Sequence, residues 1–193
     1  MKLKLICIIN FVTILFSSGG YDDGSSAGKG KFDLSFTLNP FNYFEYGQSY
    51  LIVGYGLTDK FDLHGYFSSG QDKQQNYYGG IFYQFFKNNR FHLATAVGIR
   101  KFRQSQITHI FFPQFLYNIK ISEYWSIGGS VVNIREMKLE SEIGTSFDIF
   151  IKKNLYESNK YKLDITFGGF KPVMWEPKTG DFYPTYSIDI KIK

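Results

Sequence analysis

The chain of 193 residues has a single cysteine, Cys7, which lies in an apolar stretch near the amino terminus. No disulfide can form within the chain, so a small secreted domain held together by disulfide bridges is excluded. The sequence has no basic run, and its net charge of +5 is spread along the chain. Such a distribution does not indicate nucleic-acid binding. Beyond residue 20, no segment shows the sustained periodicity of an amphipathic helix.

Residues 1–20 have the three parts of a secretory signal peptide. Lys2 and Lys4 flank the start of an apolar run that extends to Phe16, and the small residues Ser17–Gly20 follow it. The run is shorter than the roughly 20 residues that a spanning helix needs, so a cleaved leader is favoured over a membrane anchor. Cleavage after residue 19 or 20 removes both lysines and lowers the net charge from +5 to +3. We therefore expect export across the inner membrane.

Aromatic residues are abundant, with 21 Phe and 15 Tyr in the chain. Many of them belong to segments of about ten residues in which apolar and polar side chains alternate, such as 143–151 and 161–169. Alternate side chains of a β-strand point to opposite faces, so each segment has one apolar face and one polar face. Aromatic girdles at both membrane interfaces are typical of membrane-spanning barrels. The sequence therefore predicts an all-β fold, a transmembrane β-barrel.

Ten segments have this pattern, which predicts a closed antiparallel up-and-down barrel of ten strands, with eight strands as the alternative. The expected strands are residues 31–38, 48–57, 61–68, 77–87, 91–102, 109–121, 125–133, 142–152, 161–170 and 183–192. Residues 21–30, rich in Gly, Ser, Asp and Lys, are expected to form a flexible lead-in to a barrel domain over 31–193. Long and short connections alternate, as expected for surface loops at one rim and tight turns at the other, except that the eighth connection, 153–160, is long.

The two faces of the expected strands differ in kind. The apolar face includes Leu51, Phe111 and Ile149 and has no charged residue. A charge on the lipid face at mid-bilayer costs about 2–4 kcal/mol, so this segregation indicates apolar side chains in lipid and polar side chains in the lumen. A soluble barrel would show the reverse arrangement. The predicted polar lining of the lumen is Asp33, Asp62, His64, Arg100, Lys120, Glu142, Asp148, Lys162, Asp164, Asp189 and Lys191.

Two expected strands carry irregular features. In the fourth strand Tyr78, Phe82 and Phe86 make the inner face aromatic. In the sixth strand Pro113 falls inside the segment, where a residue without an amide hydrogen cannot donate to the ladder. A β-bulge, or a strand start near the outer rim, would accommodate this proline.

The segment Gly54–Leu63 has the order strand, short turn containing Asp, strand, and the carboxyl end Tyr186–Lys193 alternates strictly. With the leader, these features make the chain resemble the small bacterial outer-membrane β-barrels, the OmpX-like and OmpA-like proteins of the porin superfamily. The resemblance implies a Gram-negative outer membrane, contact with its lipid, and insertion by the barrel-assembly machinery. It implies little about activity. Members usually end in an aromatic residue, whereas this chain ends in Ile192-Lys193.

The sequence shows no polar constellation typical of an enzyme, metal site or cofactor site. The three histidines, His64, His92 and His109, include no close pair. A lipid A deacylase would need His and Ser two residues apart, but the residue two beyond His109 is Phe111. An omptin-like protease would need His with acidic residues at the outer rim, and there His109 and Glu136 lie among ordinary acidic loop residues. We expect no catalysis and no cofactor.

Three functions remain open. The first is a monomeric outer-membrane barrel with a structural, adhesive or weakly permeable role and a lumen filled by side chains. Barrels of about eight strands are just wide enough to be filled in this way, and two more strands add little room. The second is a narrow passive channel for small solutes. The third is a soluble secreted barrel that binds an apolar ligand.

Overall fold

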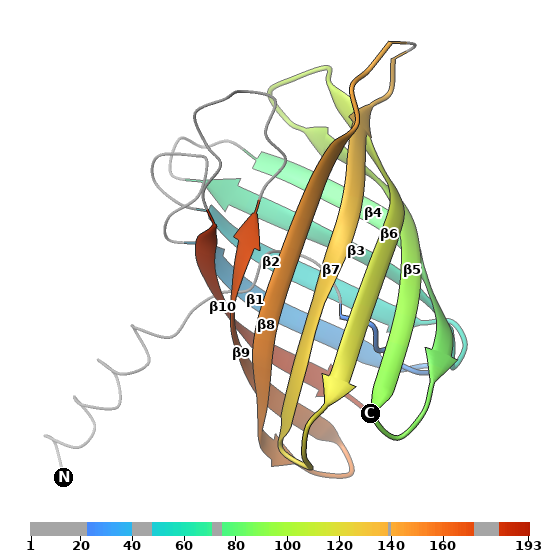
Figure 1. Cartoon of the computed structure of the whole chain (residues 1–193), viewed down its shortest axis with the longest axis vertical. Helices are drawn as coiled ribbons and strands as arrows, with labels where there is room; N and C mark the ends of the chain where they lie inside the picture. The colour runs from blue at the N-terminus through green and yellow to red at the C-terminus, as the bar shows by residue number, and fades with distance from the viewer. Residues whose placement is uncertain (1–22, 40–47, 71–74, 139, 172–181) are drawn as a thin grey trace, which may run out of the picture.

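The computed structural model describes residues 23–39, 48–70, 75–138, 140–171 and 182–193, and these form a closed antiparallel barrel of ten strands (Figure 1). Each strand pairs with its neighbours along the chain, and β1 closes the barrel against β10. The all-β up-and-down barrel is confirmed, with ten strands rather than eight. The strands are β1 (Phe32–Asn39), β2 (Gln48–Gly56), β3 (Phe61–Gly70), β4 (Gln75–Lys87), β5 (Phe91–Phe102), β6 (Thr108–Lys120), β7 (Trp125–Glu136), β8 (Gly144–Glu157), β9 (Tyr161–Lys171) and β10 (Tyr183–Ile192).

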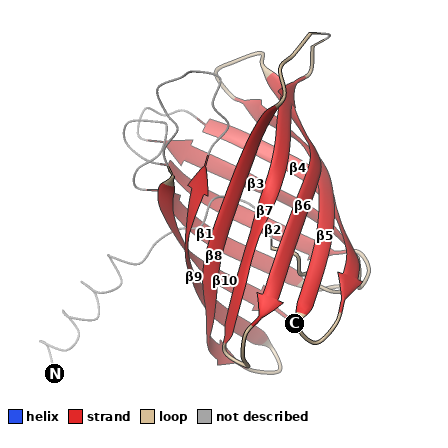
Figure 2. Ribbon diagram, in the orientation of Figure 1, coloured by secondary structure: helices blue, strands red, loops and turns tan. Residues whose placement is uncertain are grey.

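Every regular element in the described part of the chain is a strand (Figure 2). No helix among those residues is both long and apolar enough to cross a bilayer. The expected leader, residues 1–20, lies outside the described residues and stays a prediction.

The connections at the two rims differ. The turns 57–60, 88–90, 121–124 and 158–160 lie at one rim, called here the short-turn rim. The other rim, the long-loop rim, has the connections 40–47, 71–74, 103–107, 137–143 and 172–182, of which 40–47, 71–74, 139 and 172–181 lie outside the described residues. The sequence places a long eighth connection at 153–160, but β8 continues to Glu157, so this connection is also a tight turn.

Side chains in the short turns hold the chain reversals. The Thr58 hydroxyl accepts a hydrogen bond from the Phe61 amide at 2.9 Å, and the Asn88 side-chain oxygen accepts one from the Phe91 amide at 2.7 Å. Turn residues that bond to backbone two or three positions further on stabilise the reversal locally. The first two short turns are therefore specified by their own sequence.

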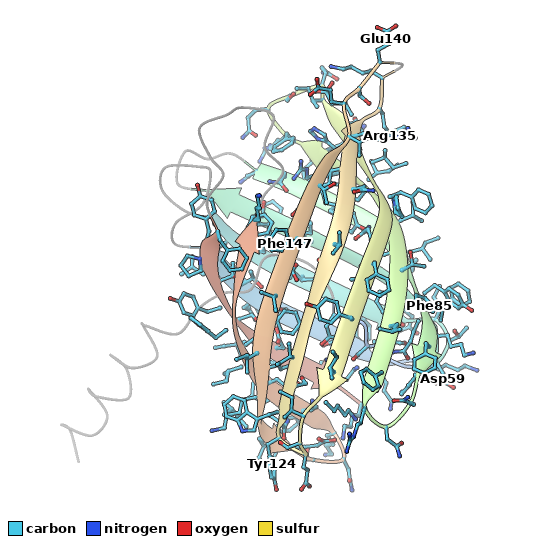
Figure 3. The ribbon with its side chains drawn as sticks, in the orientation of Figure 1. Asp59, Phe85, Tyr124, Arg135, Glu140 and Phe147 are labelled. Carbon is cyan, nitrogen blue, oxygen red and sulfur yellow. The ribbon has the colours of Figure 1, made fainter. Side chains whose placement is uncertain are left out.

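The two faces of the wall point as the sequence predicts. On the outside, Leu51 and Ile149 are 39% and 46% exposed, whereas Asp148 and Asp164 are buried inside the barrel. Figure 3 shows Phe85 and Phe147 on the outer surface, with Tyr124 near the short-turn rim and Glu140 beyond the long-loop rim. The apolar surface of this barrel is therefore its exterior, the reverse of a soluble barrel.

The expectation that Phe111 faces outward is wrong. The register between β6 and β7 shifts between Phe111 and Gln114, so that Phe112 and Pro113 form a bulge with exposed side chains. An inserted residue reverses which side chains point inward on either side of it. Phe111 is consequently buried in the lumen, and the expected bulge at Pro113 is confirmed.

The expectation that Phe86 faces inward is also wrong, for the same reason. The register between β4 and β5 shifts between Gln84 and Phe86, and both Phe85 and Phe86 are exposed on the outside. Tyr78 and Phe82, on the other side of this bulge, are buried inside as expected. The inner face of β4 is therefore aromatic only up to the bulge.

Candidate functional site: the barrel lumen

Residues Asp23–Gly28, called here the strap, lie inside the barrel close to the short-turn rim. The sequence predicts a flexible lead-in over 21–30, yet the described part of it has a defined place, with Gly24, Ser26 and Ala27 buried. Hydrogen bonds and ion pairs join the strap to six strands: β3, β4, β5, β6, β8 and β10. A segment bonded to so much of the wall crosses the lumen rather than following one side of it.

The middle of the strap is held by hydrogen bonds to side chains on β3, β4 and β5. Asp62 accepts hydrogen bonds from the Ser26 hydroxyl at 2.8 Å and from the Ala27 amide at 2.7 Å. The Gln84 side chain donates to the Gly24 carbonyl at 2.6 Å, and the Ser25 hydroxyl is hydrogen-bonded to His92 Nδ1 at 2.9 Å. A Cβ on Gly24 would lie 2.4 Å from the His92 carbonyl oxygen, so only glycine allows this approach.

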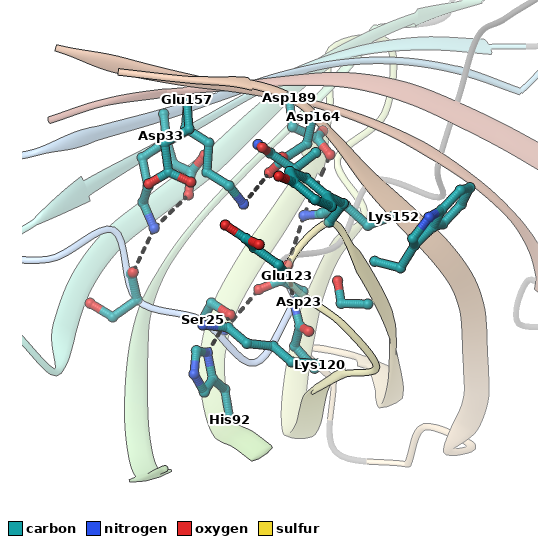
Figure 4. A pocket seen from close by; sticks show the side chains of 18 of the residues that line it. Asp23, Ser25, Asp33, His92, Lys120, Glu123, Lys152, Glu157, Asp164 and Asp189 are labelled. Atoms are coloured by element: carbon teal, nitrogen blue, oxygen red, sulfur yellow. Dashed lines mark hydrogen bonds and ion pairs between the residues drawn. The ribbon is translucent and has the colours of Figure 1, made fainter. Parts of the chain in front are cut away.

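Asp23, the first residue of the strap, is held by charge. Lys152 Nζ lies 2.7 Å from Asp23 Oδ2, and the Asn118 amide donates to the same oxygen at 2.9 Å (Figure 4). Burial on its own raises the pKa of the Asp23 carboxyl, but the charge of Lys152 and its hydrogen bond, with the charge of Lys191, hold that pKa below its ordinary value. Asp23 is therefore ionised at neutral pH and pairs with Lys152.

The wall around the strap is a network of ion pairs. Asp189 accepts hydrogen bonds from Ser35, Thr166 and Ser187 and lies 3.4 Å from Lys152 Nζ. Lys191 lies 3.4 Å from Asp33 and donates to the Ser26 carbonyl at 2.8 Å. Charges that are partly withdrawn from water in this way are tolerated because each has an opposite charge or hydrogen-bonding partners.

A further pair lies beside this network. Lys162 Nζ is 2.8 Å from Asp164, which also accepts a hydrogen bond from the Asn154 side chain at 2.7 Å. Together with the strap, these groups line a vestibule of about 350 Å³ that opens at the short-turn rim. Lys87 and Lys120 also reach its surface. The charged part of the lumen is thus a polar chamber that the strap helps to line.

The lumen toward the long-loop rim is filled by a different set of side chains, called here the aromatic layer. The ring centroids of Tyr66 and Tyr78 are 5.2 Å apart in a stacked arrangement, and those of Tyr78 and Phe111 are also 5.2 Å apart. The remaining members pack against these rings, and they are Ile52, Val132 and Ile134. Aromatic and aliphatic side chains from five strands thus pack together across this part of the lumen.

Tyr78 is the centre of the aromatic layer. Its hydroxyl is hydrogen-bonded to His64 Nε2 at 3.0 Å and accepts a hydrogen bond from the Gln114 amide at 2.8 Å. A Cβ on Gly98, on the neighbouring strand, would lie 2.3 Å from the tyrosine ring. The ring therefore lies across β5 at a position where only glycine leaves room for it.

Arg100 lies at the side of this layer. Its guanidinium is 4.9 Å from the ring centroids of both Phe102 and Phe111, a cation–π arrangement. The His109 ring meets Phe102 edge-on at 5.8 Å. His109 is buried opposite Glu136 in the register of β6 and β7.

The structure distributes the predicted lumen residues over these regions. The vestibule is lined by Asp33, Lys120, Lys162, Asp164, Asp189 and Lys191, and Asp62 binds the strap. His64 and Arg100 join the aromatic layer, and Asp148 is buried where it accepts a hydrogen bond from Ser130 at 2.8 Å. The expectation that Glu142 lines the lumen is wrong. Because β8 begins at Gly144, Glu142 belongs to an exposed connection.

Sequence reasoning missed two parts of the lumen. Lys152 follows the same alternation as Asp148 and Phe150, so the pattern of β8 contained a signal for its inward position. The strap has no such signal, because its partners lie on strands far away in the sequence. Among the described residues, no group of three His, Cys, Asp or Glu side chains is placed to hold a metal ion. The expectations of no cofactor and no catalysis stay predictions.

Similar solved structures are outer-membrane barrels with low sequence identity. A KdgM porin has a TM-score of 0.49 and 10% identity, covering 84% of this chain and 98% of that one. A KdgM porin in complex with disordered oligogalacturonate has a TM-score of 0.48 and 9% identity, with the same coverage. OccAB2 of Acinetobacter baumannii has a TM-score of 0.27 and 11% identity, covering 82% of this chain and 58% of that one. No family model and no curated protein matches the chain. At these values the neighbours assign the chain to no family.

Proposed function

We propose that this protein is a monomeric barrel of the bacterial outer membrane whose lumen is closed, and that its role is structural or adhesive rather than catalytic. The observation that carries the proposal is that two groups lie across the lumen, the strap on one side and the aromatic layer on the other. Specific contacts with other molecules would then be made by the connections at the long-loop rim.

The outer face of the barrel supports the placement in a membrane. Large apolar side chains such as Phe36, Ile81 and Phe167 are at least half exposed there. A closed barrel pairs every strand with two neighbours, so it leaves no edge of unpaired backbone groups in the hydrocarbon. A soluble barrel that binds an apolar ligand would have its apolar side chains inside, so the third of the three functions is disfavoured.

The charges on the outer face also fit an anionic membrane surface. On the strands that the structure describes, the outward-facing charged side chains are all cations, and they are Lys101, Arg135, Lys153 and Lys171. Carboxylates on these strands point into the lumen or toward the rims of the lumen. Cations near the ends of spanning strands are attracted to anionic lipid headgroups.

Planar-bilayer recording of the full-length mature chain tests the closed lumen. We expect no steady conductance, because the aromatic layer excludes a continuous water path. Heat-modifiable migration on a gel and protection of the strands from protease must show in the same preparation that the barrel has inserted. A reproducible single-channel step from inserted protein would contradict the proposal.

A narrow channel for small solutes is the second candidate, and the vestibule of about 350 Å³ favours it because charged side chains of the lumen line this vestibule. The recording described above separates the two functions. The likeness to OmpX-like and OmpA-like proteins stays a prediction. Barrels of that type have about eight strands, whereas this one has ten. The outer-membrane location and the assembly machinery are likewise proposals, which fractionation of the producing cell would test.

A further inference from the structure

A groove crosses the outside of the barrel over β7, β8, β9 and β10. It has a volume of about 280 Å³, and its apolar walls include Ile151, Ile165, Phe167 and Tyr186. In the pairing register, Trp125 lies opposite Lys153, which lies opposite Ile165. Trp125 is the first residue of β7, so this row is nearer to the short-turn rim than the row that contains Ile151 and Phe167. The groove therefore has an apolar part and, toward the rim, a basic and aromatic end.

Lys153 gives that end a positive charge. Its Nζ lies 5.1 Å from the centroid of the Trp125 ring, on the outer face of the wall. Lys152, its neighbour in sequence, points inward and is paired with Asp23. No outward-facing carboxylate occurs on the described strands to neutralise Lys153, so the charge of the groove is uncompensated by the wall around it.

We infer that this groove binds one anionic phospholipid of the bilayer, with an acyl chain along the apolar walls and the headgroup phosphate at Lys153. The inference rests on the proposed membrane placement. An acyl chain matches the apolar groove, and an anionic phosphate matches the single cation at its rim-side end. The indole of Trp125 lies at the same depth, where aromatic side chains prefer the boundary between hydrocarbon and headgroups. The site selects lipid by headgroup charge.

Tryptophan fluorescence tests the site directly. The chain has two tryptophans, Trp125 and Trp175, so the Trp175→Phe variant leaves one reporter at the groove. The protein is reconstituted into vesicles of brominated phosphatidylcholine, which quenches an indole in contact with its acyl chains. Unbrominated phosphatidylglycerol is then added as the anionic competitor, and recovery of fluorescence measures its preference for the groove.

We expect phosphatidylglycerol to displace the brominated lipid with about a fivefold preference, the size expected for one lysine near anionic headgroups. Lys153→Gln should remove the preference and bring it to about one. Lys101→Gln is the matched control, because Lys101 also faces outward but lies on β5 near the long-loop rim. Lys101→Gln should keep the preference.

The other outcomes overturn the inference in distinguishable ways. Equal preference in the parent and in Lys153→Gln, or no preference in the parent, would show that the groove has no anionic lipid site while leaving the membrane placement intact. Absence of any quenching by the brominated lipid would show that Trp125 does not meet hydrocarbon. That result would contradict the membrane placement itself.

Discussion

Different kinds of contact hold the groups that lie in the two halves of the lumen. Near the short-turn rim the strap is held by polar bonds, such as the Asp23–Lys152 pair at 2.7 Å. Toward the long-loop rim the aromatic layer is held by packing, with Tyr78 between two other rings at 5.2 Å. The strap comes from outside the strand sequence, whereas the aromatic layer is part of the wall.

The two kinds of contact are expected to contribute differently to the stability of the barrel. Buried aromatic side chains contribute directly to the free energy of folding, because their removal leaves a cavity. A network of buried ion pairs contributes much less net stability, since desolvation of the charges offsets their attraction. We therefore expect the aromatic layer to stabilise the barrel, and the strap network to fix one segment in one position.

The largest effect is expected from the aromatic layer. Tyr78→Ala should lower the free energy of unfolding by about 3–5 kcal/mol, the usual cost of removing a large buried aromatic side chain. Urea unfolding from lipid vesicles measures the change. Tyr77→Ala is the control, because Tyr77 is on the same strand but is 45% exposed on the outer face. Equal losses in the two variants would contradict the assignment of inner and outer faces.

A smaller effect is expected from the strap network. Lys152→Gln leaves Asp23 without its charge partner and should cost about 2–3 kcal/mol, below the range of about 3–5 kcal/mol for fully buried pairs. The reduction reflects the residual exposure of the two side chains, 17% and 9%. Protease accessibility of the strap and urea unfolding report the change.

Two further variants sharpen the result for the strap. Adding Asp23→Asn to Lys152→Gln should recover part of the loss, because the carboxylate of the strap is then no longer left inside the barrel without a cation. Lys153→Gln, one residue further on and outside the barrel, should leave the strap protected. A strap that is released equally by Lys152→Gln and by Lys153→Gln would rule out the Asp23–Lys152 pair as its anchor.

The smallest effect is expected from pH. The Asp23 pKa is lower in the folded barrel than its ordinary value of 3.8, so the stability it contributes is complete above that ordinary value. It is lost progressively as the pH falls toward the lowered pKa. The Ser25 amide donates to Asp23 Oδ1 at 2.8 Å. Its hydrogen-exchange protection should thus stay constant between about pH 5 and 8 and decrease below about pH 4. Release of the strap already at pH 6 would contradict this assignment.

The strands of the barrel wall could be predicted from the sequence because the alternation of apolar and polar residues lies within each strand. A two-residue alternation repeated over a whole strand predicts both the strand and its faces, as Leu51 outside and Asp164 inside show. The exceptions have a local cause that the pattern does not reveal. An extra residue at a bulge reverses the alternation, which is why Phe111 and Phe86 are on the faces opposite to those expected.

The contents of the lumen depend on contacts between distant parts of the chain. Asp23 meets Lys152, and Ser26 meets Asp62 and Lys191, pairs that no periodicity connects. Small polar residues suit a flexible segment and equally suit a segment threaded into a narrow space. The composition of 21–30 therefore could not distinguish these outcomes. The difference depends on contacts with strands that come together only when the barrel closes.

Site-directed spin labelling along β8 tests the central claim most directly, namely apolar side chains in lipid around a closed lumen. With Cys7 replaced by Ser, single cysteines at positions 146–151 carry one label each in vesicle-inserted protein. We expect labels at 147, 149 and 151 to collide with lipid-soluble oxygen, and labels at 146, 148 and 150 to be shielded from oxygen and from a water-soluble nickel complex. High nickel accessibility at the odd positions would show that water surrounds the barrel, and at the even positions that the lumen is open.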